Sequence, residues 1–329
     1  MPAMSVMRYM NSVGIIPQIL IGEPEPTKKE LDLYKVKYQE INKLPEYDVM
    51  LSEANGHLPF EIRWMTESKK RGKTNVMLIN SLSSVNIHIP SFTPDKTKLL
   101  DGMCMKADVD ILQYRSFNNE LFMINVGDPD WDYWKTEEFK KKEKEVRDRF
   151  GNKIFVICCV FARPEEVPYT ELCIKKAKEL GFSPIINVHP DRWSKVPASL
   201  LKYCNKGIHH HVLFSASSHL LTTICSTVFF EGLYLRTHVG CNQAVYHSGR
   251  RGNHVWLNKE TWFKAVSKQS KQEFIDMAEP VFNEADLESF LLSPKPKIPI
   301  EQIVKTFGLI TVPCYTEYLF KTLDKKLKG

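Results

Sequence analysis

The residues best suited to chemistry in this chain are two hydroxyls and a carboxylate that follow one apolar run. The run at 220–224 leads to Ser226 and Thr227, and a helix-like segment then carries Glu231. Hydroxyl and backbone N–H groups at a helix N-terminus bind phosphate because they meet the positive end of the helix dipole, and a carboxylate one turn along can accept hydrogen bonds from ribose hydroxyls. The pattern predicts a nucleotide site. The alternative is an N-cap hydroxyl followed by a surface glutamate.

His189 and Pro190 form a second polar feature, directly after a predicted strand at 183–188. This strand completes a strand, helix and strand unit that begins with the apolar segment 153–161, and such a unit is a right-handed crossover between parallel strands. Ligands of open α/β sheets bind at the carboxyl ends of such strands. The imidazole could donate to a phosphate oxygen while the proline fixes the turn. A histidine that only caps the strand is the alternative.

Two arginines could add positive charge at the same edge. Arg163 follows the segment 153–161 and could neutralise a diphosphate, and Arg192 stands shortly after His189. A surface arginine paired with Glu165 or Glu166 is the alternative for Arg163.

The first half of the chain offers two candidate general bases. Glu53 and His57 follow a predicted strand at 48–51 and so stand at a carboxyl end as well. Each residue type can take a proton at neutral pH when its pKa is tuned. A polar loop with a helix cap is the alternative.

Three consecutive histidines, His209, His210 and His211, raise the question of a metal site. Consecutive strand residues point to opposite faces, and the predicted strand at 211–214 has no cysteine or carboxylate beside it in sequence to complete a ligand set. We therefore expect no metal centre and no cofactor.

The elements that position these residues alternate between strand-like and helix-like segments, which predicts an α/β protein with largely parallel sheets. The expected helices lie at 6–13, 135–150 and 168–180. The expected strands lie at 15–21, 48–51, 75–79, 109–112, 121–126, 153–161, 183–188, 211–214, 220–224 and 237–241. A turn-rich aromatic segment at 126–134 separates the two halves.

Composition sets the broad class. At 329 residues the chain exceeds the usual size of one core, so two domains are expected, and 43% hydrophobic with 26% charged residues is typical of a globular protein. The 45 basic and 39 acidic residues leave a net charge of +6, which favours phosphate-bearing ligands without indicating nucleic acid. The eight cysteines include no C-x-x-C pair, and the sequence shows no signal peptide. No apolar stretch approaches the roughly 18 residues that are needed to span a membrane. These features together predict a cytoplasmic protein. Peripheral contact with a membrane remains open.

Together, four motifs resemble those of the GT-B superfamily, the glycosyltransferases with two Rossmann-like domains that also include the UDP-N-acetylglucosamine 2-epimerase-like group. These are the Lys-Ala-Asp at 106–108, the Val-Gly-Asp-Pro-Asp-Trp-Asp at 126–132, the His-Pro at 189–190 and the Ser-Thr-Val-Phe-Phe-Glu at 226–231. The last two are similar to motifs of bacterial sialyltransferases and glycerol-phosphate polymerases. The resemblance covers most of residues 48–241. One departure is that the chain opens with a predicted helix rather than with a strand and a glycine-rich turn.

The resemblance implies two Rossmann-like domains that face each other across a cleft. Residues 1–130 would form the acceptor domain, 131–298 the nucleotide-sugar domain, and 299–329 a helix that returns to the first domain. His189, Ser226 and Thr227 would contact the donor phosphates, and Glu231 the ribose.

The activity implied is that of a metal-independent glycosyltransferase of glycan biosynthesis, which moves a sugar from a nucleotide-sugar donor to a glycan or another hydroxyl acceptor. An epimerase or hydrolase of nucleotide sugars, or a non-catalytic binding protein with the same fold, are the alternatives.

Overall fold

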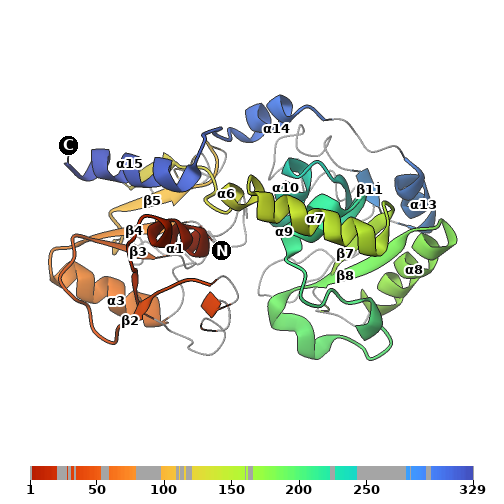
Figure 1. Cartoon of the computed structure of the whole chain (residues 1–329), viewed down its shortest axis with the longest axis horizontal. Helices are drawn as coiled ribbons and strands as arrows, with labels where there is room; N and C mark the ends of the chain where they lie inside the picture. Colours follow the sequence, from red (N-terminus) through yellow and green to blue (C-terminus); the bar gives the residue numbers. More distant parts are fainter. Residues whose placement is uncertain are drawn as a thin grey trace. The chain divides into compact units, whose positions relative to one another are not determined.

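The chain divides into two compact units. A computed structural model describes residues 2–20, 28, 31–32, 35–52, 59–78, 98–108, 111, 115, 121–159, 161, 166–222, 227–242, 279–281, 283–293 and 298–328. Unit 1 comprises Met1–Thr136 and Phe307–Gly329, and unit 2 comprises Glu137–Thr306 (Figure 1). The units therefore change at 136/137 and 306/307, compared with 130/131 and 298/299 in the prediction.

Unit 1 contains a parallel sheet whose strands follow one another in chain order. They are β3 (Val49–Ser52), β4 (Thr74–Leu78), β5 (Gly102–Met105) and β6 (Phe122–Asn125). A separate parallel pair joins β1 (Gln18–Ile19) and β2 (Gln39–Glu40). All the carboxyl ends of the four-stranded sheet consequently lie at one edge.

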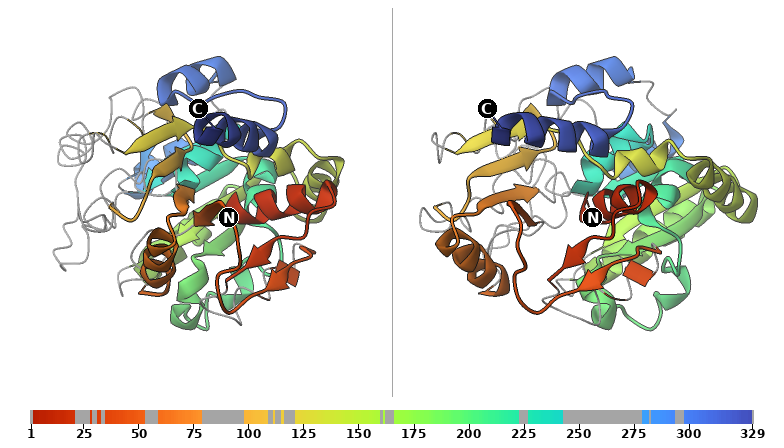
Figure 2. Two further views of the ribbon diagram at one scale, coloured as in Figure 1. Left: turned by 90° about the vertical axis from the view of Figure 1, so that its left-hand side faces the viewer. Right: turned by 60° about the vertical axis from the view of Figure 1, so that its left-hand side comes forward.

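The two faces of this sheet have different cores, because side chains alternate along each strand. One face is rich in methionine and packs against α3 (Pro59–Lys70) through Met65. The other face packs against α1 (Pro2–Ser12) and α15 (Tyr315–Lys328), which lie side by side in Figure 2. The carboxyl-terminal helix α15 thus contributes Leu319 and Leu323 to the core of unit 1.

The start of α15 is fixed by a carboxylate from the short helix α6 (Trp131–Trp134). Asp132 accepts hydrogen bonds from the backbone N–H groups of Tyr315 (2.7 Å) and Thr316 (2.9 Å) and from the Thr316 hydroxyl (2.9 Å). These donors are the N–H groups that a helix leaves without an intrahelical acceptor. Asp132 therefore acts as an N-cap that is supplied from a distant part of the sequence.

A buried ion pair lies just beyond the carboxyl ends of β5 and β6. Lys106 Nζ is 2.6 Å from Asp128 Oδ2, and the two side chains are only 4% and 3% exposed. Burial raises the pKa of Asp128 to about 6, although the Lys106 ammonium opposes that shift. Asp128 Oδ1 also accepts the Asp130 N–H at 3.0 Å. The pair thus ties together two of the segments on which the GT-B resemblance was based.

Unit 2 contains a five-stranded parallel sheet in the order β11-β10-β9-β7-β8. The strands are β7 (Ile154–Cys159), β8 (Ser183–Val188), β9 (His219–Thr222), β10 (His238–Asn242) and β11 (Glu279–Val281). The central strand β7 is buried along almost its whole length, as expected of a parallel strand that is covered on both faces.

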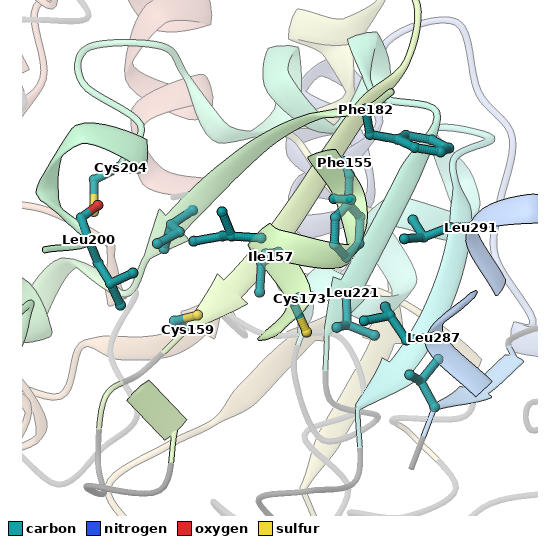
Figure 3. Packing of buried hydrophobic residues seen from close by; sticks show 14 of the residues in the cluster. Phe155, Ile157, Cys159, Cys173, Phe182, Leu200, Cys204, Leu221, Leu287 and Leu291 are labelled. Carbon is teal, nitrogen blue, oxygen red and sulfur yellow. The ribbon is translucent and has the colours of Figure 1, made fainter. Parts of the chain in front are cut away.

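Helices cover both faces of this sheet. On one face, α8 (Glu166–Glu179) and α13 (Glu284–Leu292) pack on Phe155, Ile157 and Leu221 (Figure 3). On the other lie α7 (Glu137–Phe150), α9 (His210–Ala216) and α10 (Thr227–Tyr234). Adjacent residues of β10 point to the two different faces of the sheet, since Val239 faces α10 and Gly240 faces Phe290 of α13. Two short 3-10 helices, Pro190–Lys195 and Leu201–Tyr203, follow β8.

Several predicted elements differ from the structure. Residues 211–214, predicted as a strand, belong to helix α9. Ile111, within the predicted strand 109–112, is helical and donates its N–H to the Ala107 carbonyl. The segment after 299 contains two helices, α14 (Ile300–Phe307) and α15, instead of one. Short apolar runs fit a buried helix as well as a strand, which explains the first two errors.

Among the helices of the described residues, none combines the length and the apolar character that are needed to span a bilayer.

Candidate functional site

The order of the strands in unit 2 creates a topological switch point between β7 and β9. From β7 the chain passes through α8 to β8 on one side, whereas β9, β10 and β11 continue outward on the other side. Ligands of open parallel sheets bind outside the carboxyl ends of the strands at such a point, because the connections there diverge. This edge is therefore where functional side chains are expected.

Two helices of unit 2 begin at this edge. Helix α9 ends just before the start of β9, so its first residue lies toward the carboxyl ends of the strands, and α10 begins after the carboxyl end of β9. The start of α9 is capped by His209, whose Nδ1 accepts the His211 N–H at 3.2 Å. Helix α10 packs very closely on the sheet, because Gly232 leaves no space for a Cβ against Leu220 and Val239.

The first turns of these helices bring a histidine and a glutamate together in the interior. His211 Nε2 is 3.2 Å from Glu231 Oε1. Both residues are buried, with 4% and 8% of their surface exposed. Burial of a carboxylate costs free energy unless a partner compensates, and the imidazole supplies one. The surface-glutamate alternative is consequently wrong for Glu231.

His210 completes a compact cluster with this pair. One ligand atom each of His210, His211 and Glu231 lie within 4.8 Å of one another. The ring centroids of His210 and His211 are 4.0 Å apart, and those of His209 and His210 are 4.6 Å apart. Burial, reinforced by the neighbouring His211, holds the pKa of His210 well below its usual value, so that its imidazole is neutral at physiological pH.

Cys158 and Asn187 border the cluster from the ends of β7 and β8. Burial raises the pKa of the Cys158 thiol well above its usual value, the negative charge of Glu231 adds to this shift, and a hydrogen bond with Asn187 opposes it. The Asn187 amide oxygen also accepts from Asn205 Nδ2 at 3.4 Å. Cys158 therefore remains a thiol and offers no thiolate nucleophile.

Of the predicted site residues in unit 2, His189, Arg192, Thr227 and Glu231 can be placed at this edge. His189 directly follows β8, is exposed, and donates its backbone N–H to the carbonyl of Cys159 at the end of β7 (3.0 Å). The Arg192 N–H donates to the His189 carbonyl (2.9 Å), which makes a tight turn, and Thr227 is the first residue of α10. Glu53, His57, Arg163 and Ser226 lie outside the described residues.

Sequence reasoning missed the contribution of His211 to this site. A strand at 211–214 would place neighbouring histidine rings on opposite faces of a sheet. Glu231 is also distant in sequence, so the sequence alone does not bring it next to His211. The available signal was the polar His209 before a helical run, since a polar side chain at that position caps a helix.

Comparison with solved structures identifies the fold. A variant of the wall teichoic acid polymerase TagF, soaked with CDPG, matches with a TM-score of 0.59 over 99% of this chain and 85% of that chain, at 12% identity. The UDP-N-acetylglucosamine 2-epimerase from Rickettsia bellii matches with a TM-score of 0.58 over 99% and 93%, at 11% identity. The S. aureus MnaA-UDP co-structure matches with a TM-score of 0.53 over 100% and 94%, at 12% identity. The chain has a GT-B-like fold.

The predicted fold class, an α/β protein of the GT-B type, is thereby confirmed. At 11–12% identity these GT-B structures establish the fold and leave the activity to the site itself. No protein-family profile matches the sequence, and no curated protein sequence does so either.

Proposed function

We propose that the protein is a glycosyltransferase that takes a sugar from a nucleotide-sugar donor and passes it to a glycan or another hydroxyl acceptor, without a metal. The observation that carries this proposal is the buried Glu231, held by His211 at the carboxyl edge of a parallel sheet beside its switch point. A carboxylate in that position has the chemistry to accept hydrogen bonds from the vicinal hydroxyls of a ribose.

In this proposal different residues of unit 2 bind the ribose and the phosphates of the donor. Glu231 binds the ribose, and His211 fixes the carboxylate by holding one of its oxygens. The N-terminus of α10, with Ser226 and Thr227, and the side chains of His189, Arg163 and Arg192 bind the phosphates. Donors aimed at the leaving diphosphate stabilise the charge that develops there as the glycosidic bond breaks. Positioning of the acceptor supplies further rate.

The acceptor side of the proposal concerns unit 1. Glu53 or His57 would take the proton of the attacking hydroxyl if the configuration at the sugar is inverted. If the configuration is retained, neither residue needs to act as a base.

A second candidate function is epimerisation of a nucleotide sugar. It is favoured by one observation, the likeness to the Rickettsia bellii UDP-N-acetylglucosamine 2-epimerase, which is as extensive as the likeness to the polymerase. An epimerase converts a nucleotide sugar in the absence of any acceptor, whereas a transferase requires one. Nuclear magnetic resonance of UDP-N-acetylglucosamine incubated with the protein alone separates the two functions.

Nucleotide binding is tested by a thermal-shift screen with UDP, GDP, CDP, CMP and dTDP. A ligand present at about 100 times its dissociation constant adds about 2.7 kcal/mol to the free energy of unfolding. We expect one nucleotide to stabilise the wild type, and Glu231→Gln and His189→Ala to lose most of that stabilisation. Glu179→Gln is a matched control, because Glu179 is exposed and lies at the last residue of α8, away from the carboxyl edge of the sheet where the proposed site lies.

The outcomes of the screen are distinct. If no nucleotide raises the melting temperature, the donor site is wrong and a non-catalytic role is favoured. If a nucleotide stabilises the wild type and Glu231→Gln equally, the protein binds nucleotide elsewhere. If the configuration at the sugar is inverted, replacement of both Glu53 and His57 should leave nucleotide stabilisation intact and abolish sugar transfer.

A further inference from the structure

The cluster of His210, His211 and Glu231 has the composition of a metal site as well as of a ribose contact. Two imidazoles and one carboxylate are the protein ligands of one common class of zinc site, in which a water or substrate oxygen takes the fourth position. Here the three groups come from the first turns of two helices that pack on each other. Ligands that are carried by packed helices are held in place before a metal arrives.

The distances in the cluster suit a small tetrahedral ion. With metal–ligand bonds of about 2.1 Å, two ligand atoms of a tetrahedral site lie about 3.4 Å apart. His211 Nε2 and Glu231 Oε1 are 3.2 Å apart, and all three ligand atoms lie within 4.8 Å of one another. The limit of 4.8 Å exceeds the tetrahedral separation by about 1.4 Å, so a movement of the His210 imidazole nitrogen of at most about that size brings the third ligand into range.

The electrostatics of the cluster also suit a cation. A buried carboxylate is costly without a compensating charge, and a divalent ion supplies such a charge directly. The capping bond from the His211 N–H to His209 Nδ1 fixes the backbone that carries both histidine ligands.

We propose that His210, His211 and Glu231 bind a divalent transition metal ion of the Zn²⁺ type. Mg²⁺ and Ca²⁺ are poor candidates, since they prefer oxygen ligands and this set has two nitrogens. The objection raised from the sequence disappears, because the histidines begin a helix instead of alternating along a strand and a carboxylate lies beside them.

One consequence rests on the proposed function. If Glu231 binds the donor ribose, Zn²⁺ and nucleotide exclude each other, and the metal inhibits the enzyme instead of assisting it. The metal site itself is tested without nucleotide, so its failure would leave the proposed function untouched. Conversely, failure of the nucleotide screen would leave the metal site standing.

The experiment is a calorimetric titration of Zn²⁺ alone into the full chain after treatment with a chelator. We expect one tight equivalent in the wild type. His211→Gln and Glu231→Gln should each weaken it at least about tenfold, which is the lower end of the loss caused by changing even an outer-shell group. Replacement by Co²⁺ should give the strong visible absorption of a tetrahedral site in the wild type and not in these variants.

The matched control is His209→Asn. Asparagine is a good N-cap residue, so α9 keeps its cap while the histidine run becomes shorter by one imidazole. Unchanged Zn²⁺ affinity in this variant supports the three-ligand site. Equal weakening by His209→Asn and His211→Gln would mean that the metal binds only to a run of histidines. Wild-type affinity in Glu231→Gln, with thermal unfolding confirming that the variant is folded, would also overturn the proposal.

Discussion

The buried pair of Lys106 and Asp128 gives the sharpest test of the energetics of unit 1. At 2.6 Å and an effective dielectric constant of about 20, the attraction between the two charges is roughly 6 kcal/mol. Desolvation of each ion costs several kcal/mol, so the net contribution of the pair is small. The raised pKa of Asp128, about 6, agrees with this balance, because burial outweighs the effect of the ammonium.

Removal of one partner should be far more costly than removal of both. Lys106→Met keeps the aliphatic stem, and Asp128→Asn keeps the oxygen that accepts the Asp130 N–H. Each single change leaves a buried charge without its partner and should lower the free energy of unfolding by about 3–5 kcal/mol. The double variant should lose only about 1–2 kcal/mol, the cost of an imperfectly satisfied buried amide.

Urea unfolding followed by tryptophan fluorescence measures these losses, since Trp131 is buried in unit 1 and is close to Asp128 in sequence. The two units can unfold separately, so the transition that shifts in the variants identifies unit 1. The double-mutant cycle should therefore give a coupling energy of about 4–9 kcal/mol, which is the sum of the two single losses minus the loss of the double variant. Two results would contradict this account of two charges that compensate each other. In one, the losses of unfolding free energy in the two single variants add up to the loss in the double variant. In the other, each single variant loses less than about 1 kcal/mol.

Three further predictions concern other buried features. Burial, followed by the neighbouring His238, lowers the pKa of His219 to about 4. The unfolded chain therefore binds more protons than the folded chain between pH 4 and about 6.5. The free energy of unfolding should fall by up to about 3 kcal/mol as the pH drops from about 6.5 toward 4. His219→Gln should flatten this pH dependence in unfolding titrations. Asp132→Ala removes the N-cap of α15 and should cost about 1–2 kcal/mol, with faster amide exchange in its first turn than in Asp132→Asn. Gly232→Ala would place a Cβ 2.5 Å from Leu220 and should cost about 1–3 kcal/mol; a simultaneous Leu220→Ala that restored no stability would count against this packing.

The parts of unit 2 that the sequence predicted well are those in which local pattern and burial agree. The strand at 183–188 was predicted with the same bounds as β8, and the apolar run at 153–161 contains β7. Strand β8 is followed at the carboxyl edge by the turn from His189 to Arg192, so the placement of His189 there also followed from the sequence. In both cases a largely apolar run of strand length is closely followed by a polar side chain, His189 or Arg163, and no tertiary contact is needed to recognise the strand.

The parts that escaped prediction depend on contacts between distant residues. Strand β5 was missed because Gly102–Met105 is short and is flanked by Asp101 and Lys106, which suggest a polar loop. Lys106 is nevertheless buried, because its charge is compensated by Asp128, which follows the carboxyl end of the neighbouring strand β6. In the same way, Glu231 is buried because α9 supplies His211. Neither compensation is visible before the sheet is assembled.

The two buried polar pairs are therefore expected to respond differently to substitution, although each lies near the carboxyl edge of its own sheet. In the pair of unit 1 both partners carry full charges that compensate each other, so replacing one partner should chiefly lower stability. In the pair of unit 2 the carboxylate of Glu231 faces an imidazole nitrogen at 3.2 Å rather than an ammonium group. A ribose hydroxyl or a metal ion can take the place of this contact at little net cost. Comparable losses of stability for Asp128→Asn and Glu231→Gln, with ligand binding unaffected in the second, would remove the physical basis for placing the functional site at Glu231.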